Sequence, residues 1–296
     1  MTTGQAPPVT DTSPAIEAQA AQPDGRTAVR ARFTALKLRS VGAVGLLSLP
    51  LFLFFVIPIA ALLLRTSGAD VLGSLARPAA WQAIDLSLRT TTITVTLAVL
   101  LGTPLAYVLA RRHFPGRRAV DTLVELPTVL PPAVAGVALL VAFGRQGLVG
   151  SWLASVGLPL AFTGAAVVLA QLFVAGPLYV KTMAVGLAAI DLDLEQAAAI
   201  DGASRWQIFR YITGPLAYPA ALSGAVLTWS RALGEFGATI LFAGNFPGRT
   251  QTMPLAIYIG FETDFNVALT LSAILIAVSF LVLIVVKLLL QKEQAV

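Results

Sequence analysis

Apolar runs long enough to cross a lipid bilayer recur along most of this 296-residue chain. A helix needs about 20 mostly apolar residues to span the hydrocarbon core of a bilayer. The pattern predicts six such helices, at residues 41–64, 86–110, 122–144, 161–186, 216–243 and 267–290. Shorter polar segments separate them. We therefore expect an all-α membrane protein with one six-helix transmembrane domain over residues 41–290.

Prolines interrupt two of these runs. Pro127, Pro131 and Pro132 lie inside the third, and proline removes a backbone donor and clashes with the preceding turn of a helix. The third span is therefore expected to be kinked or locally unwound, which a membrane protein tolerates where other protein covers the break. Gly176 and Pro177 predict a similar break in the fourth span.

The two ends of the chain are polar. Residues 1–40 have no apolar run and are rich in Ala, Pro, Thr and Gln, so they bury too little apolar surface to order themselves. We expect a disordered, basic tail there and a short tail at residues 291–296. The first apolar run begins near Val41 and is longer than that of a signal peptide, so it is expected to remain as the first span.

Basic residues are unequally divided between alternate sides of the predicted helices. Four lie on the poorer side: Arg65, Arg77, Arg145 and Arg249. The richer side has Arg26, Arg30, Arg32, Lys37, Arg39, Arg111, Arg112, Arg117, Arg118, Arg205, Arg210, Lys287 and Lys292. Because positively charged loops stay in the cytoplasm, both termini are predicted to be cytoplasmic.

Composition supports the membrane assignment and excludes several kinds of site. Hydrophobic residues make up 57% of the chain and charged residues only 12%. The net charge of +5 is scattered over alternate loops, which indicates topology and not a nucleic-acid-binding face. The chain has no cysteine and one histidine, so disulfides, thiolate metal sites and histidine clusters are excluded. We expect no metal site and no catalytic residues, since lone His113 has no acid or nucleophile placed with it.

A polar loop between the fourth and fifth spans has its own helical pattern. It runs EQAAAIDGASRWQIFRYITGP, from Glu195 to Pro215. The alanines predict a short helix, Asp201 and Gly202 a turn, and Ser204 the cap of a second helix. Ile208, Phe209 and Ile212 would form one apolar face of that second helix, suited to a partner's surface. An amphipathic helix lying at the membrane interface is the alternative.

This loop resembles the EAA loop of ABC importer permeases, in which Glu-Ala-Ala, three residues, Gly, nine residues, Ile, any residue and Leu-Pro follow one another. Gly202, Ile212 and Pro215 fall in register, whereas Gly214 replaces the Leu. Gln196 takes the acidic position and Glu195 lies one residue early, so either can make the polar contact of that acid. The resemblance implies a type I ABC importer permease fold and a loop, residues 187–215, that couples transport to an ATPase subunit. Its candidate residues are Glu195, Gln196, Ala197, Ala198, Asp201, Gly202, Ala203, Phe209, Ile212 and Pro215.

Two further segments resemble the molybdate and tungstate permeases of the sulfate and molybdate importer branch. They are Leu126 to Gly150 and Ser230 to Tyr258. The resemblance implies a permease subunit in a bacterial or archaeal inner membrane that works as a homodimer with two cytoplasmic ATPase subunits and an external oxyanion-binding protein. The chain has no P-loop pattern, so ATP and Mg²⁺ are expected in the partner subunit and no cofactor in this chain. The alternatives are sulfate, thiosulfate or tungstate as cargo, a self-contained secondary transporter, and a membrane anchor without transport.

Charged residues within the predicted fifth span mark a candidate pore or dimer contact. Arg231 and Glu235 are four residues apart and can pair on one helical face. Such a pair either stabilises a buried helix contact or lies beside the translocation route. Gly234 and Gly237 permit close helix approach.

Two other groups of polar residues have simpler explanations. Hydroxyls in the second span can line a pore, although such threonines more often bond to their own helix. They are Thr90, Thr91, Thr92, Thr94 and Thr96. Basic residues after this span are expected to fix orientation and touch anionic lipid head groups. These are Arg111, Arg112, His113, Arg117 and Arg118.

Overall fold

The computed structural model of the chain describes residues 47–66 and 68–294. The chain divides into two compact units, residues 1–61 and 62–296. The described part of the first unit belongs to a helix, Leu47–Arg65, whose 19 residues are apolar enough to cross a membrane. The tail expected at residues 1–40 lies outside the described residues, as does the start of the first expected span.

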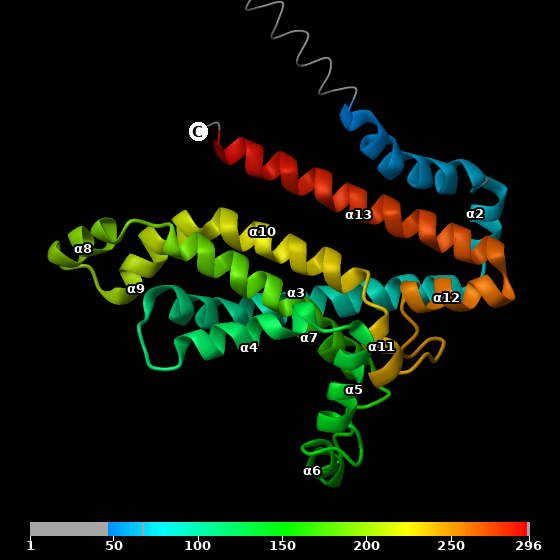
Figure 1. Cartoon of the computed structure of the whole chain (residues 1–296), viewed down its shortest axis with the longest axis horizontal. Helices are drawn as coiled ribbons and strands as arrows, with labels where there is room; N and C mark the ends of the chain where they lie inside the picture. Colours follow the sequence, from blue (N-terminus) through cyan, green and yellow to red (C-terminus); the bar gives the residue numbers. More distant parts are fainter. Residues whose placement is uncertain (1–46, 67, 295–296) are drawn as a thin grey trace, which may run out of the picture. The chain divides into compact units, whose positions relative to one another are not determined.

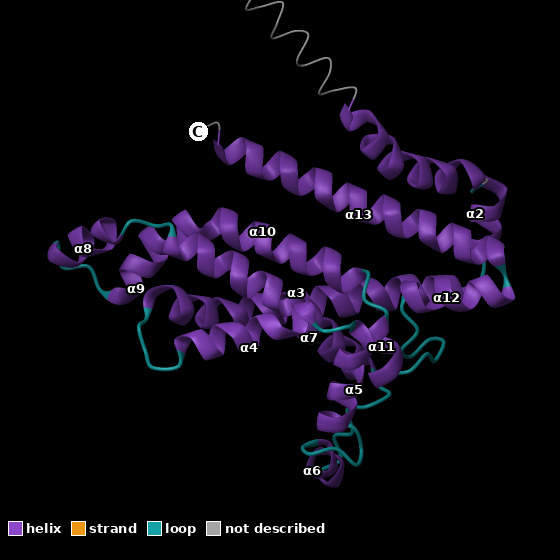
Figure 2. Cartoon of the chain, in the orientation of Figure 1, coloured by secondary structure: helices purple, strands orange, loops and turns teal. Residues whose placement is uncertain are grey.

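The second unit is built from helices joined by short loops (Figure 1). In chain order they are α2 (Gly68–Leu75), α3 (Pro78–Arg111), α4 (Arg117–Val129), α5 (Pro132–Phe143), α6 (Gly150–Ser155), α7 (Gly164–Ala188), α8 (Leu192–Ile200), α9 (Arg205–Ile208), the π-helix η2 (Phe209–Thr213), α10 (Gly214–Leu233), α11 (Gly237–Phe242), α12 (Met253–Thr263) and α13 (Phe265–Gln294). Figure 2 shows helices and loops and no strand over the described residues. The expected all-α class is confirmed.

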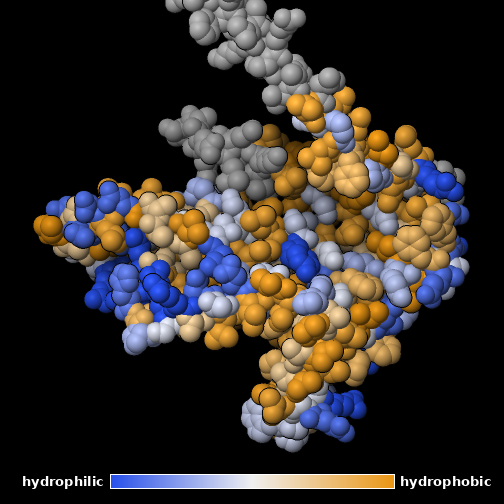
Figure 3. Space-filling view, in the orientation of Figure 1, coloured by the Kyte–Doolittle hydropathy of each residue, from blue (hydrophilic) through white to orange (hydrophobic). Residues whose placement is uncertain are grey.

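Four described helices have the length and composition of a membrane span: Leu47–Arg65, α3, α7 and the part of α13 up to Val285. Together, α4 and α5 form a fifth candidate. The remaining expected span, the fifth, is α10, whose 20 residues are long enough to cross although its polar residues make it less apolar. Hydrophobic residues cover much of the surface seen in Figure 3, whereas hydrophilic residues gather at the end that carries α8 and α9.

The core beside the candidate site joins α3, α7 and α10. Leu109 of α3, Tyr179 and Leu187 of α7, and Ala217 of α10 are buried in one cluster. The three helices lie side by side and end toward α8 and α9 (Figure 1). Close van der Waals packing stabilises this cluster, because lipid is as apolar as these side chains and burial from lipid alone gives little driving force.

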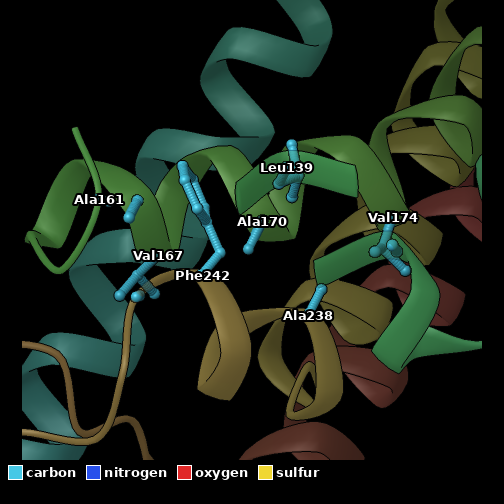
Figure 4. Packing of buried hydrophobic residues seen from close by; sticks show 10 residues of the cluster. Leu139, Ala161, Val167, Ala170, Val174, Ala238 and Phe242 are labelled. Carbon is cyan, nitrogen blue, oxygen red and sulfur yellow. The ribbon is translucent and has the colours of Figure 1, made fainter. Parts of the chain in front are cut away.

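The third expected span is sharply broken at its prolines. The axes of α4 and α5 differ by 117°, and Pro131 precedes the first residue of α5. Beyond the bend, α5 packs with α7 and α11 around Phe242, which is fully buried. The ring of Phe242 lies near Ala161, Val167 and Ala170 (Figure 4). The predicted break is present, and it redirects the chain instead of only kinking it.

Two expectations about the later spans are wrong. The break expected at Gly176 and Pro177 is absent, because α7 continues through both residues, which are buried against neighbouring helices. A proline removes one helical hydrogen bond, and surrounding helices can hold the chain in place. The fifth span, expected to run unbroken to residue 243, ends at Leu233. Glu235 explains the break, since its Oε1 accepts a hydrogen bond from the backbone N of Ala238 (2.8 Å) and so favours a new helix start.

Helices outside the six expected spans complete the fold. The sequence pattern did not single out α12, whose 11 residues precede α13. Two expected boundaries also moved: α3 begins eight residues before residue 86, and α13 continues past residue 290 to Gln294. Residues 295 and 296 of the expected C-terminal tail lie outside the described part of the chain.

Candidate functional site: the loop between α7 and α10

The first half of the loop is a helix held by an acidic cap. Asp191 caps α8 by accepting a hydrogen bond from the backbone N of Asp193 (3.0 Å). Asp193 and Glu195 lie in the first turn, where negative charge is favourable because the helix dipole is positive at that end. Ala197, Ala198 and Ala199 follow as strong helix formers. The local sequence alone therefore accounts for α8.

A tight turn and a second cap follow. Gly202 has φ of +88°, a left-handed conformation that glycine adopts without steric cost. Ser204 then caps α9: its Oγ accepts from Gln207 N (3.3 Å), and Ser204 N donates to Gln207 Oε1 (2.7 Å). This reciprocal pair is a capping box. Turn and cap lie where the sequence indicated them.

The second helix does not continue as an α-helix. After four residues of α9 the chain enters η2, and Gly214 N donates to the Phe209 carbonyl oxygen. A Cβ on Gly214 would lie 2.8 Å from that oxygen, closer than real Cβ contacts allow. The wider turn thus depends on glycine at the position where the EAA pattern has Leu. Short π-helical turns often occur at functional sites.

The apolar face expected on the second helix is only partly exposed. Ile208, Phe209 and Ile212, expected to form a face for a partner, are half-buried. The Phe209 ring packs edge-to-face on Tyr107 of α3, with the ring centroids 6.4 Å apart. One side chain of the expected face thus contacts the protein's own α3. The contact of this face with a partner stays a prediction.

Five other large apolar residues are exposed on the loop, and two of them, Leu192 and Leu194, are 50% exposed. Ile200 is 85% exposed, Trp206 66% and Tyr211 69%. Trp206 stacks on Phe209, with the ring centroids 5.9 Å apart, so its ring is held in place while remaining exposed. Large apolar and aromatic groups on an exposed loop mark an interaction surface. Sequence reasoning missed Trp206 and Tyr211, since an α-helical wheel places neither of them on the expected face.

Of Glu195 and Gln196, Glu195 is bonded to other parts of this chain. Its Oε1 accepts hydrogen bonds from Arg111 Nη2 (3.1 Å) and from Thr213 Oγ1 (2.9 Å). Gln196, by contrast, is exposed. Glu195, which lies one residue before the acidic position of the EAA pattern, is therefore the residue bonded to the rest of the fold.

Arg111 does not belong with the basic residues that follow it. Its side chain is only 8% exposed, and Nη2 also donates to the Ile190 carbonyl oxygen (3.1 Å). His113, Arg117 and Arg118, which were grouped with it in the sequence, line an open cavity of about 680 Å³ at the turn between α3 and α4. The role in orientation expected for the whole cluster thus does not describe Arg111.

The expected pair within the fifth span is present. Arg231 Nη1 lies 2.7 Å from Glu235 Oε2, and the Glu235 side chain is 1% exposed whereas that of Arg231 is 37% exposed. The two are not on one helix, because Glu235 lies in the break after α10. One carboxylate therefore pairs with a partly exposed cation and also accepts a hydrogen bond from the backbone of α11. This arrangement agrees with a structural role at the break and leaves the guanidinium partly accessible.

The two glycines of the candidate pore differ in their surroundings. A Cβ on Gly237 would lie 2.6 Å from Pro132 Cβ, so α11 and α5 approach closely there. A Cβ on Gly234 would meet nothing closer than the Ser230 carbonyl oxygen at 3.8 Å. Of these two glycines, only Gly237 lies at a close contact between helices.

The threonines of α3 mostly bond to their own helix. Four of the hydroxyls donate to carbonyl oxygens four residues earlier; they belong to Thr90, Thr91, Thr92 and Thr96. Thr94 differs, because its hydroxyl donates to Gln171 Oε1 of α7 (3.0 Å) inside the core. These bonds favour the structural explanation for the group.

One ionic contact was missed entirely. Lys181 of α7 lies 2.9 Å from Asp121 and 3.5 Å from Glu125, both on α4. Lys181 falls inside an apolar run, and a cation there needs a partner. A lysine inside the fourth expected span indicates that a carboxylate partner must lie nearby. The sequence does not say which acidic residues those are. No group of three or more His, Asp or Glu residues suited to a metal ion occurs within residues 47–66 and 68–294.

Comparisons with known proteins agree with this architecture. The chain is 42% identical over 231 residues to the molybdenum transport system permease protein ModB of Mycobacterium tuberculosis, covering 78% of this chain and 88% of the relative. It is 34% identical over 237 residues to the probable sulfate transport system permease protein cysT of Chlorokybus atmophyticus, covering 79% and 83%. Both relatives are named as transport system permeases.

Solved structures share the fold. The crystal structure of a bacterial ABC transporter involved in the import of the acidic polysaccharide alginate contains a chain that matches with a TM-score of 0.69 at 18% identity, covering 89% of this chain and 99% of that chain. Residues 98–293 match the family described as the binding-protein-dependent transport system inner membrane component. This matched region contains the end of α3, the later apolar spans, the broken third span and the loop that holds Glu195. The chain therefore belongs to the family of binding-protein-dependent transport system inner membrane components.

Proposed function

We propose that this chain is the membrane-spanning permease subunit of an ATP-driven molybdate importer. The observation that carries the proposal is the 42% identity, over 88% of its length, to a relative named as a molybdenum transport permease. Family membership argues against a self-contained secondary transporter and against a membrane anchor without transport. As a membrane component of a transport system, the chain is not itself an enzyme.

The loop between α7 and α10 is the proposed contact with an ATPase subunit. Support comes from its exposed apolar residues, Ile200, Trp206 and Tyr211, on short helices fixed by caps. A rigid surface of this kind loses little conformational entropy when a partner binds. Two such ATPase subunits would bind and hydrolyse ATP with Mg²⁺, since the P-loop pattern is absent from this chain.

The cargo would be delivered from outside by an oxyanion-binding protein and would pass between two copies of this chain. In this scheme, closure of the ATPase pair draws the two loops together and changes the pore from inward-open to outward-open. Arg231, Gly234, Glu235 and Gly237 are the candidate residues near the pathway or the dimer contact. Partial exposure of the Arg231 guanidinium supports its candidacy, because an accessible cation can attract an oxyanion.

Sulfate is the second candidate cargo. The 34% identity to a probable sulfate permease favours it, and molybdate and sulfate are both tetrahedral dianions. The higher identity to the molybdenum permease places molybdate first.

The test is uptake in proteoliposomes by a complex of this chain with the ATPase subunit and the binding protein of a molybdate importer. Labelled molybdate should accumulate only when ATP and the binding protein are both present. Unlabelled molybdate should compete strongly and a tenfold excess of sulfate weakly. Equal competition by sulfate would favour the second candidate, and uptake driven by an ion gradient without ATP would contradict both.

A further inference from the structure

A single carboxylate oxygen joins three parts of the fold. Glu195 Oε1, on α8, accepts hydrogen bonds from Arg111 Nη2 at 3.1 Å and from Thr213 Oγ1 at 2.9 Å. Arg111 is the last residue of α3, and Thr213 directly precedes α10. The loop helix is thus bonded to the ends of two long helices at one point.

These three side chains are shielded from water. Arg111 is 8% exposed and Glu195 16%, while Thr213 is 2% exposed as a residue. Hydrogen bonds and ion pairs are stronger in such surroundings than on an open surface, and removal of one partner leaves an uncompensated buried charge. Movement of α8 away from α3 or α10 therefore requires that this contact break.

Arg111 holds α8 at a second point. Its Nη2 also donates to the carbonyl oxygen of Ile190 at 3.1 Å, and Ile190 directly precedes the cap residue Asp191. The Arg111 guanidinium therefore donates hydrogen bonds both to the backbone just before α8 and to a side chain in its first turn. Two attachment points along a short helix restrict its rotation as well as its displacement.

The helices at the other side of the contact are packed together. Leu109 lies one half-turn before Arg111, and Ala217 lies one turn after Thr213; both are buried in the cluster that also contains Leu187 of α7. Displacement of α3 or α10 is therefore expected to displace α7 as well, because packed interiors have low compressibility.

We propose that Arg111 is a positioning residue that couples α8 to α3 and α10 through Glu195 and Thr213. Binding of ATPase subunits moves α8, and the Arg111–Glu195–Thr213 contact passes this movement to the membrane helices. The inference rests on the proposed function of the loop and deepens it by naming the connection inside this chain.

The experiment uses the complete complex in proteoliposomes and measures ATP hydrolysis and molybdate uptake in the same sample. Arg111→Gln should still assemble with the ATPase subunits and hydrolyse ATP, while the number of anions transported per ATP falls roughly tenfold, within the range that single coupling residues carry. Arg112→Gln is the matched control, because Arg112 is exposed and adjacent in the chain. It should keep the wild-type ratio.

Two further variants guard against a simple folding defect. Thr213→Val keeps the ion pair and removes only one donor, so it should lower the transport ratio by a smaller factor. The exchange Arg111→Glu with Glu195→Arg should recover part of the ratio that Arg111→Gln loses. A wild-type ratio in both Arg111→Gln and Thr213→Val, or an equal loss in Arg112→Gln, would overturn the proposal.

A measurement without cargo separates this inference from the proposed function. Since the chain has no native cysteine, spin labels can be placed at Ala199 of α8 and at His113 beyond α3. The distance distribution between the labels should broaden in Arg111→Gln and remain narrow in Arg112→Gln. Absence of ATP-driven uptake in the wild-type complex would count against the proposed function, whereas an unchanged distribution in Arg111→Gln would count against the Arg111 contact.

Discussion

Gly237, the first residue of α11, lies against Pro132, the first residue of α5, so closely that an added Cβ would come within 2.6 Å of the proline Cβ. A larger side chain would have to push apart two helices that surround buried Phe242. We expect Gly237→Leu to lower stability by about 1–3 kcal/mol, the usual cost of overpacking. The yield and thermal unfolding of the purified protein measure the effect.

Gly234 provides the matched control for that change. Its nearest non-neighbouring atom would be 3.8 Å from an added Cβ, and its φ of −86° suits other residues. Gly234→Leu should therefore give a much smaller loss. Equal losses from both substitutions would show that the contact with Pro132 is not the cause.

The turn at Gly202 should tolerate asparagine and reject proline. Its φ is +88°, whereas proline fixes φ near −65° and asparagine enters the left-handed region more easily than most residues. An added Cβ meets nothing within 4 Å, so the constraint is the backbone alone. Gly202→Pro should keep membrane insertion but lose ATP-driven uptake, and Gly202→Asn should retain most of it. Normal uptake by Gly202→Pro would remove the main support for the loop as the ATPase contact.

Restoring the family's leucine should harm this protein. Gly214→Leu would place Cβ 2.8 Å from the Phe209 carbonyl oxygen and so open the π-turn that brings Thr213 to Glu195. We expect lower thermal stability and a reduced ratio of transport to ATP hydrolysis. Gly73→Leu, at a site with nothing within 4 Å, is the control. If Gly214→Leu behaves like Gly73→Leu, the π-turn does not require glycine.

An exposed ion pair predicts a small dependence of stability on pH. Arg77 donates a hydrogen bond to Asp264, and this contact lowers the pKa of the Asp264 carboxyl below its usual value. Because the folded-state pKa is lowered, the contribution is present above the pKa of the unfolded state and is lost as pH falls through the folded-state pKa. Thermal unfolding of Arg77→Gln and wild type should therefore differ near neutral pH and converge in acid. A difference that grows in acid would contradict the assignment.

The orientation in the membrane can be tested by labelling because native cysteine is absent. Ser151 and Ala199 are both exposed, and the basic-residue bias places Ser151 outside and Ala199 inside. A cysteine at Ser151 should react with an impermeant reagent in intact cells, and one at Ala199 only after permeabilisation. Labelling of both from the same side would contradict the proposed topology.

Most helices followed from local constraints. Lipid offers no hydrogen-bond partners to the backbone, so long apolar runs must be helical, and their number and approximate limits could be predicted from the sequence. The turn at Gly202 and the cap at Ser204 depend only on a few neighbouring residues, and both are found where they were expected. The resemblance to the permease family likewise rests on short sequence segments, which can be recognised along the chain without the structure.

Contacts between distant segments could not be predicted in this way. Pro177 is buried among helices distant in sequence and does not break α7. α10 ends early, and Glu235, just beyond it, accepts a hydrogen bond from Ala238 N in the helix that follows. The π-turn over Phe209–Thr213 and the exposure of Trp206 and Tyr211 were likewise not expected from the sequence.

Glu195 is bonded to Arg111, which is 84 residues away in the chain. The sequence by itself determined the class of the fold, the loop and its local turns, because these depend on lipid solubility and on neighbouring residues. Tertiary structure alone decided which loop residue is bonded to the spans and which face is free for a partner. Both depend on burial and charge pairing between helices, and the pattern along one helix does not specify its neighbours.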